Sequence, residues 1–288
     1  MATLKEIRIR LNAVKNIQKI TKAMKMVSAA KMRKAQDRIL STRPYAYKLS
    51  ELMSQLVALA NISGHPLTQQ RDIKKRIVVL ITSDRGLCGA FNSNIIKYTV
   101  NHLNNVGTDT ALVTLGKKGY DFFSKRKYNV IKNYPDIFHN LNIQSSNEIV
   151  SYLKELFLTG EYDYIEVIFN EFKSIIKQNI VTETLLPFSS KTVNNDKKMQ
   201  NASFIYEPEA KQILKELIPK ELNIQFWKAL LESNASEQGA RMTAMDAASN
   251  NAGDLIQGLN LSYNRARQES ITNELLEIVS GAEALRKE

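Results

Sequence analysis

Residues 4–27, LKEIRIRLNAVKNIQKITKAMKMV, decide the fold of this chain because their apolar side chains recur every three or four positions. The recurring positions are Leu4, Ile7, Leu11, Val14, Ile17, Ile20, Met24 and Val27. This spacing puts them on one stripe of an α-helix, and such a stripe needs a second helix to cover it. The segment therefore predicts a long helix with a helical partner.

The same end of the chain carries all of its net charge. Residues 1–48 contain thirteen Lys or Arg and two acidic residues, a net charge of +11, which equals that of the whole 288-residue chain. Lys15, Lys19, Lys22 and Lys25 lie between the apolar positions, so the remaining faces of the helix are basic. Too few acids are present for intrahelical ion pairs to balance this charge. A concentrated positive field favours acidic surfaces, so we expect an acidic partner.

Pro44 is expected to kink or restart this helix, because proline removes a backbone donor and clashes with the preceding turn. Residues 50–60 still have a helical pattern, and Asn61, Gly64 and Pro66 then end the helix.

Residues 75–206 have the pattern of an inserted α/β domain. Short apolar runs predict strands at residues 76–82, 111–115 and 164–170, and helical stretches follow at residues 91–103, 116–124 and 147–158. This alternation predicts a Rossmann-like, largely parallel sheet, with residues 180–186 as an added edge strand. The polar residues 189–201 are expected to form a mobile loop.

Residues 208–288 have a helical pattern interrupted by one proline after residue 209, Pro219. A helix of the roughly 65 residues beyond it would be about 100 Å long and would need a partner along its length. Small residues would let two backbones approach closely: Ala235, Gly239, Ala240, Ala244, Ala247, Ala248, Ala252 and Gly253. We therefore expect an antiparallel two-helix coiled coil formed by residues 1–60 and 208–288, with the α/β domain between them.

The composition excludes several classes of protein. The chain can bury a proper core, but it has no run of about 18 apolar residues to span a bilayer and no apolar segment typical of a secretion signal. The single cysteine, Cys88, can form no internal disulfide, and three scattered histidines offer no metal-ligand spacing. We expect no catalytic residue, no cofactor and no bound metal.

The stretch SDRGLCG at residues 83–89 lies between a predicted strand and a helix, where a phosphate-binding loop would lie. It matches neither phosphate-loop pattern. We interpret it as a tight turn with Asp84 and Arg85 held by their neighbours and with Cys88 as a small, half-buried packing residue. A nucleotide-dependent enzyme centred on this loop is an alternative that lacks a positioned general base. Phe226 and Trp227 are expected to be core contacts rather than a ligand box.

The C-terminal residues form a tip that is apolar over much of its circumference: Ile271, Leu275, Ile278, Val279, Ala282 and Leu285. Such a surface implies a socket in another protein. A basic coiled coil that binds nucleic acid is a second alternative, suggested by the pI of about 9.5. Residues 1–44, however, contain no aromatic side chain that could stack on bases.

Several motifs together resemble the gamma subunit of F-type ATP synthase, in the same order along the chain. They are KEIR at residues 5–8, ITKAMKMV at 20–27, MRKAQ at 32–36, RPY at 43–45, SDRGLCG at 83–89, ASEQ at 235–238, ARM at 240–242, ITNE at 271–274 and EIVSGA at 277–282. The resemblance runs over essentially the full length. The extra cysteine-bearing insertion of chloroplast members is missing, so thiol control is not expected.

The resemblance implies a non-catalytic rotor shaft that couples proton flow to ATP synthesis and, in reverse, ATP hydrolysis to rotation. The implied partners are three alpha and three beta subunits, the epsilon subunit and the c-ring, with peripheral association at the cytoplasmic face of the bacterial plasma membrane. Met24 and the lysines at 19, 22 and 25 would face acidic loops of the beta subunits. Loops that grip the shaft would meet Arg267, Gln268, Thr272 and Glu274. Tyr206 and Glu207 would lie near the c-ring, and a bearing tip of Leu275, Ile278, Val279, Ala282 and Leu285 would turn in an apolar sleeve.

Overall fold

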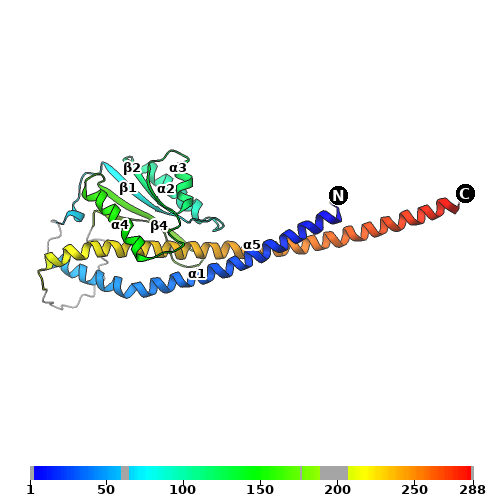
Figure 1. Cartoon of the computed structure of the whole chain (residues 1–288), viewed down its shortest axis with the longest axis horizontal. Helices are drawn as coiled ribbons and strands as arrows, with labels where there is room; N and C mark the ends of the chain where they lie inside the picture. Colours follow the sequence, from blue (N-terminus) through cyan, green and yellow to red (C-terminus); the bar gives the residue numbers. More distant parts are fainter. Residues whose placement is uncertain (1–2, 60–64, 176, 189–206, 287–288) are drawn as a thin grey trace. The chain divides into compact units, whose positions relative to one another are not determined.

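The computed structural model describes residues 3–59, 65–175, 177–188 and 207–286. The chain divides into two compact units, Met1–Ser28 with Met242–Glu288, and Ala29–Arg241. Two long helices, α1 (Leu4–Leu59) and α5 (Ala210–Arg286), contribute residues to both units (Figure 1). The predicted division into residues 1–60, 75–206 and 208–288 stays a prediction.

The second unit contains a five-stranded sheet in the order β3-β2-β1-β4-β5. The first four strands in this order run parallel and β5 is antiparallel to β4. The largely parallel sheet and the added edge strand were predicted, whereas the direction of β5 was not. The strands are β1 (Lys75–Ile81), β2 (Asp109–Leu115), β3 (Val130–Tyr134), β4 (Tyr164–Phe172) and β5 (Gln178–Leu186).

The sequence did not predict β3. Its residues, VIKNY, form no continuous apolar run, and none of its side chains is fully buried. The strand is held by main-chain pairing with β2, which includes a register shift between Leu112 and Val113. An edge strand of this kind depends on its neighbour rather than on its own hydrophobicity.

Helices cover both faces of the sheet. Helices α2 (Phe91–Val106) and α3 (Lys117–Ser124) pack on one face, and α4 (Ile143–Leu158) packs on the other together with α5. A one-turn 3-10 helix, η2 (Pro66–Thr68), adds Leu67 to the second face. Alternate residues of β1 therefore face different cores, with Val78 and Leu80 on one side and Val79 on the other.

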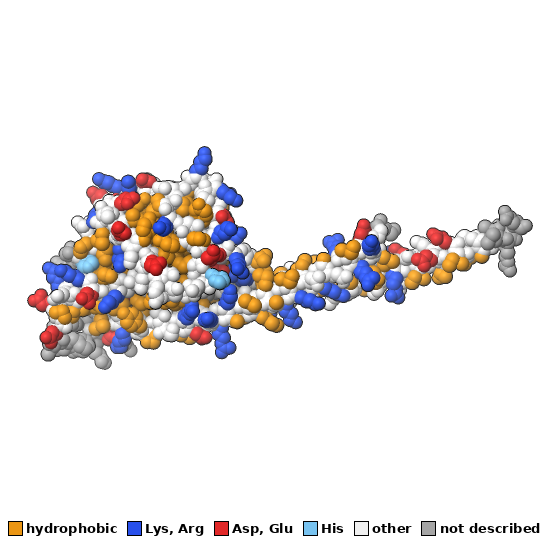
Figure 2. All heavy atoms as spheres, in the orientation of Figure 1, with side chains coloured by type: hydrophobic (Ala, Val, Ile, Leu, Met, Phe, Trp, Pro, Cys, Tyr) orange, Lys and Arg blue, Asp and Glu red, His pale blue; other side chains and the backbone are white. Residues whose placement is uncertain are grey.

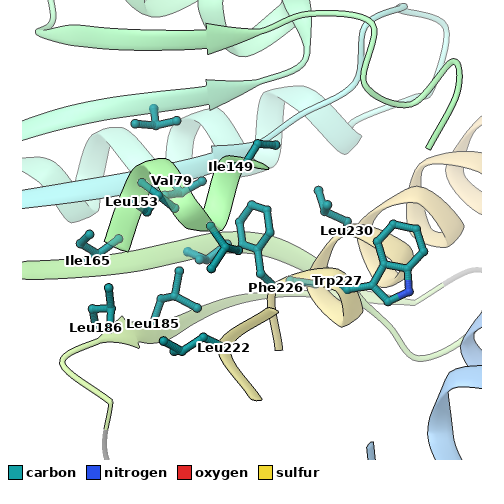
Figure 3. Packing of buried hydrophobic residues seen from close by; sticks show 14 of the residues in the cluster. Val79, Ile149, Leu153, Ile165, Leu185, Leu186, Leu222, Phe226, Trp227 and Leu230 are labelled. Atoms are coloured by element: carbon teal, nitrogen blue, oxygen red, sulfur yellow. The ribbon is translucent and has the colours of Figure 1, made fainter. Parts of the chain in front are cut away.

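The larger core joins α5 to the sheet. Phe226 of α5 is completely buried among Val79, Ile149 and Leu153 (Figure 3), and Trp227 is nearly so. Both residues are core contacts, as predicted. Met53 and Leu56 of α1 belong to the same core, so the part of α1 in this unit also packs against the α/β layers.

Two prolines lie inside the long helices. Helix α1 continues through Pro44 to Leu59, so the expectation that it restarts there is wrong. Proline removes a single backbone donor, and burial of Leu49 and Met53 beyond it stabilises the continuing helix. Helix α5 likewise begins at Ala210 and includes Pro219.

The first unit is an antiparallel pair of helical segments, so the predicted coiled-coil architecture with an inserted α/β domain is confirmed. Lys25 Nζ lies 2.6 Å from Asp246 Oδ1, and Gln18 Nε2 donates to the carbonyl of Ser249 at 3.4 Å. The two segments come close at Gly253, where a Cβ atom would lie 3.2 Å from Gln18 Nε2. A small residue there permits the close packing that the sequence suggests.

Within the described residues, no helix combines the length and the apolar character needed to cross a bilayer.

Glu221 of α5 is a partly buried carboxyl group in the second unit. Its Oε2 atom has no hydrogen-bond partner among the described residues, and burial raises the pKa of the Glu221 carboxyl from 4.5 to about 7. Burial disfavours the charged form, so the folded protein binds this proton more tightly than the unfolded chain does. The stability of the protein should therefore fall as the pH rises from about 4.5 to about 7.

Replacement of Glu221 by Gln should remove the free-energy cost of burying an ionised carboxylate at this position. We expect Glu221→Gln to raise the free energy of unfolding by about 1–2 kcal/mol at pH 8, with the gain shrinking as the pH falls towards 4.5. Urea unfolding across this pH range measures the effect. The exposed Glu216 on the same helix provides the matched control, Glu216→Gln. A gain of equal size at both ends of the range would contradict the prediction.

Candidate functional surfaces

A basic groove runs along the first unit, between its α1 and α5 segments. Its volume is about 670 Å³, and its lining residues are Gln18, Lys19, Lys22, Lys25, Asp246, Ser249, Asn250, Gly253, Asp254 and Gln257. Lys19 and Lys22 are exposed, whereas Lys25 is half-buried and paired with Asp246. Met24 is partly buried beside them. Lys and Arg side chains recur along this part of the surface (Figure 2), so the groove offers positive charge to an outside partner.

The α5 segment of the first unit carries four more of the predicted contact residues. Arg267, Gln268, Thr272 and Glu274 are all exposed. The Thr272 hydroxyl donates to the carbonyl of Gln268 at 2.9 Å, and the Ser270 hydroxyl donates to Glu274 at 3.4 Å. Both hydrogen bonds lie within α5 itself.

The predicted bearing tip is exposed and apolar. Leu275, Ile278 and Val279 are exposed to 57%, 68% and 55%, and Ala282 is also exposed. Such large exposed fractions over consecutive turns are typical of a surface that meets another protein. The side chain of Leu285 lies outside the described residues. Tyr206 also lies outside them, and its neighbour Glu207 is exposed.

The 83–89 loop is a tight turn held by its neighbours, as predicted. Asp84 Oδ1 accepts the main-chain N–H groups of Lys117 at 3.1 Å and Asp136 at 3.0 Å. Cys88 is buried rather than half-buried, and burial raises the pKa of its thiol. Its sulfur lies 3.1 Å from Asn92 Nδ2, so this cysteine packs inside the turn.

The sequence reasoning missed one buried pair on α5, Glu237 and Arg241. The guanidinium of Arg241 lies 2.5 Å from Glu237 Oε1 and donates to the main-chain carbonyl groups of Arg85 and Gly86. The available signal was a Glu–Arg pair four residues apart in a stretch of small residues, which is the composition of a buried helix face.

Among the described residues, no three His, Cys, Asp or Glu side chains gather to hold a metal ion.

The fold and these surfaces define a coiled-coil subunit with an inserted α/β domain, whose candidate sites are surfaces for other proteins. A family model described as ATP synthase matches residues 3–285, and the chain belongs to this family, among its gamma chains. It is therefore a non-catalytic subunit of the ATP synthase complex.

The relatives match over the whole chain. The ATP synthase gamma chain of Chloroherpeton thalassium is 47% identical over 302 residues, covering 100% of this chain and 99% of the relative. That of Chlorobaculum parvum is 48% identical over 297 residues, with 100% of both chains covered. These matches support neither a nucleic-acid-binding protein nor a nucleotide-dependent enzyme.

Solved structures show the same fold. A chain from the central stalk and c-ring of the Tetrahymena thermophila mitochondrial ATP synthase is 30% identical, with a TM-score of 0.61 over 80% of this chain and 99% of that chain. A chain from the Euglena gracilis mitochondrial ATP synthase, 21% identical, matches in fold with a TM-score of 0.69 over 98% of this chain and 94% of that chain.

Proposed function

We propose that this chain is the central rotor shaft of a bacterial F-type ATP synthase. It couples proton flow through a c-ring to conformational cycling of three alpha and three beta subunits, and ATP hydrolysis drives it in reverse. The full-length identity of 47–48% with gamma chains carries this proposal. The α/β domain supplies the contact with the epsilon subunit and the c-ring.

The basic groove meets acidic loops of the beta subunits in this proposal. Lys19 and Lys22 are exposed in the groove, where a partner can reach them. Met24 lies next to them in the sequence and is partly buried. Long-range charge attraction varies gently with angle, so a basic shaft can turn past successive acidic loops without interlocking. Arg267, Gln268, Thr272 and Glu274 meet the loops that grip the shaft further along α5.

The membrane attachment follows from the c-ring contact. Tyr206 and Glu207 lie near the c-ring in this proposal, and the subunit associates peripherally with the cytoplasmic face of the bacterial plasma membrane. Exposure of Glu207 supports the contact, because an exposed carboxylate is available to a partner.

Reconstitution tests the function. The purified chain, mixed with separately purified alpha and beta subunits, should form a stable assembly that holds one copy of this chain and hydrolyses ATP. Failure of the intact chain to join such an assembly, together with salt-sensitive binding to nucleic acid, would overturn the proposal.

Deletion of the tip after Ser270 should lower the yield of this assembly several-fold. The deletion removes the exposed apolar side chains of Leu275, Ile278 and Val279, whose burial in a sleeve contributes about 1.5–3 kcal/mol each when complete. Gel filtration and ATPase assays of the assembled fraction measure the loss.

A second variant separates apolar contact from helix length. Leu275→Gln, Ile278→Gln and Val279→Gln together keep the length of α5 and remove the apolar surface. The yield should fall in this variant too, and an undiminished yield in both variants would exclude an apolar bearing.

A further inference from the structure

The buried pair Glu237–Arg241 binds helix α5 to the loop that follows β1. Arg241 donates through Nη1 to Glu237 Oε1, and through Nη2 to the carbonyl oxygens of Arg85 at 3.0 Å and Gly86 at 3.3 Å. The side chains of Arg241 and Glu237 are only 10% and 7% exposed. One guanidinium therefore holds two main-chain groups that lie more than 150 residues away in the sequence.

Burial of such a pair costs free energy that apolar side chains would not cost. Burial raises the pKa of Glu237, and the charge of Arg241 opposes that rise. The carboxylate also accepts a bond from Gln238 Nε2 at 3.3 Å. An apolar residue at position 241 could not satisfy the two loop carbonyl groups, whereas the planar guanidinium donates in several directions at once. The pair thus provides directional attachment rather than simple core filling.

The loop is held on its other side as well. The Ser83 hydroxyl donates to the carbonyl of Arg85 at 2.7 Å, and the main-chain N–H of Ser83 donates to Asn92 Oδ1 at 3.1 Å. Leu87 has a φ of +63° and its side chain is 66% exposed. A leucine held in the left-handed region persists only where surrounding bonds fix it. The loop is therefore a rigid element, and Arg241 is its bond to α5.

A second polar bond lies one turn earlier on α5. The Ser236 hydroxyl donates to the carbonyl of Asn170, near the end of β4, at 3.1 Å. Between these bonds, a Cβ atom on Gly239 would lie 3.4 Å from the carbonyl oxygen of Ile175. The segment 236–241 of α5 is thus fixed by polar contacts, whereas the segment around Phe226 is fixed by apolar ones. Arg241 is also the last residue of the second unit.

We propose that Arg241 is a positioning residue that clamps α5 to the 83–89 loop, and that this clamp carries torque between the α/β domain and α5 during rotation. The proposal rests on the rotor function proposed above. Apolar contacts resist separation but have little directional preference, so sliding costs them little. Charge-assisted hydrogen bonds lengthen as soon as the helix turns relative to the loop, and they weaken steeply with distance and angle.

The first test measures how readily the 83–89 loop opens, from the rate at which a reagent labels the single cysteine of the chain. Cys88 belongs to the 83–89 loop and is only 2% exposed, so a thiol reagent such as a fluorescent maleimide should label the full chain slowly. Arg241→Gln should speed labelling at least about ten-fold, the factor that corresponds to about 1.4 kcal/mol of easier opening. Arg241→Lys keeps the charge but loses the second donor direction, and its rate should be intermediate.

A matched variant controls for general destabilisation. Arg76 bonds both carboxylate oxygens of Glu166 at 3.2 Å, and this second buried pair lies at the opposite end of β1 from the loop. Arg76→Gln breaks it and leaves the 83–89 loop intact. With both variants compared at equal distance below their melting temperatures, labelling of Arg241→Gln no faster than that of Arg76→Gln would overturn the proposal.

The second test measures coupling in the reconstituted enzyme. Protons pumped into vesicles per ATP hydrolysed should fall at least two-fold in Arg241→Gln and recover partly in Arg241→Lys, while Arg76→Gln keeps the wild-type ratio. A merely structural role would lower pumping and hydrolysis together. A wild-type ratio in Arg241→Gln would overturn the proposal even if Cys88 labels faster. Failure of the wild-type chain to assemble would instead reject the rotor function itself.

Discussion

Gly116→Ala should strongly destabilise the α/β domain. Gly116 follows β2 with a φ of +91°, and an added Cβ would lie 2.2 Å from the carbonyl oxygen of Thr82 and 2.8 Å from its carbonyl carbon. Both contacts are with backbone, which cannot swing aside. We expect the free energy of unfolding to fall by more than about 3 kcal/mol, enough to remove much of a typical domain's stability.

The hydrogen bonds around Gly116 explain why the backbone cannot relax. Its N–H donates to the carbonyl of Tyr134 at 3.0 Å, which pairs the end of β2 with β3. The main-chain N–H of Thr82 donates to the carbonyl of Leu115 at 2.8 Å, and the Thr82 hydroxyl accepts from Gly119 at 2.9 Å. A shift that relieved the clash would break bonds in three elements.

Gly107 provides the matched control for this prediction. Its φ is +62°, but apart from its own atoms and its two chain neighbours no atom of the described residues lies within 4 Å of its added Cβ. Gly107→Ala should therefore cost only about 1 kcal/mol, the backbone penalty of the left-handed conformation. Urea unfolding of both variants measures the difference, and equal losses would mean that the close contact at Gly116 has no energetic consequence.

The sequence predicted the elements whose signal is local. Three strands and the edge strand β5 were recognisable as apolar runs, and the pairing of the chain's two ends followed from an apolar stripe that needed a cover. Strand β3 carries no such run and forms because β2 offers it a partner. Helix α1 likewise continues through Pro44 because Leu49 and Met53, which follow the proline, are buried. Helix propensity is a local property of the sequence and does not report this burial.

Among the candidate functional features too, those with a local sequence signal were predicted and those that depend on the fold were not. Charge and apolarity along a helix are visible in the sequence, so the groove lysines and the tip were predicted as surfaces for partners. The clamp at Arg241 was not predicted because its acceptors are carbonyl oxygens, which every residue has. Only the fold brings residues 85 and 86 beside α5. The ion pair between Lys25 and Asp246 was not predicted either, because the two residues are far apart in the sequence.

Neutralising the groove should reduce coupled ATP synthesis by the assembled enzyme. Lys19→Gln, Lys22→Gln and Lys25→Gln together remove three positive charges from one groove. If this groove attracts acidic loops of the beta subunits, we expect a loss of about two- to ten-fold, equivalent to about 0.4–1.4 kcal/mol. ATP synthesis in vesicles and the torque of single rotating molecules measure the effect.

Salt dependence and position distinguish this charge effect from a loss of folding. The deficit should shrink between about 0.1 M and 1 M salt, because the screening length falls from about 10 Å to about 3 Å. Lys117, Lys118 and Lys125 are exposed on the α/β domain, and their replacement by Gln gives the same change in net charge elsewhere. Because Lys25→Gln also leaves Asp246 without its cation, Lys19→Gln with Lys22→Gln forms a second comparison. Unchanged synthesis and torque in the groove variants, or an equal loss in the α/β-domain control, would exclude the basic groove as the site of electrostatic coupling.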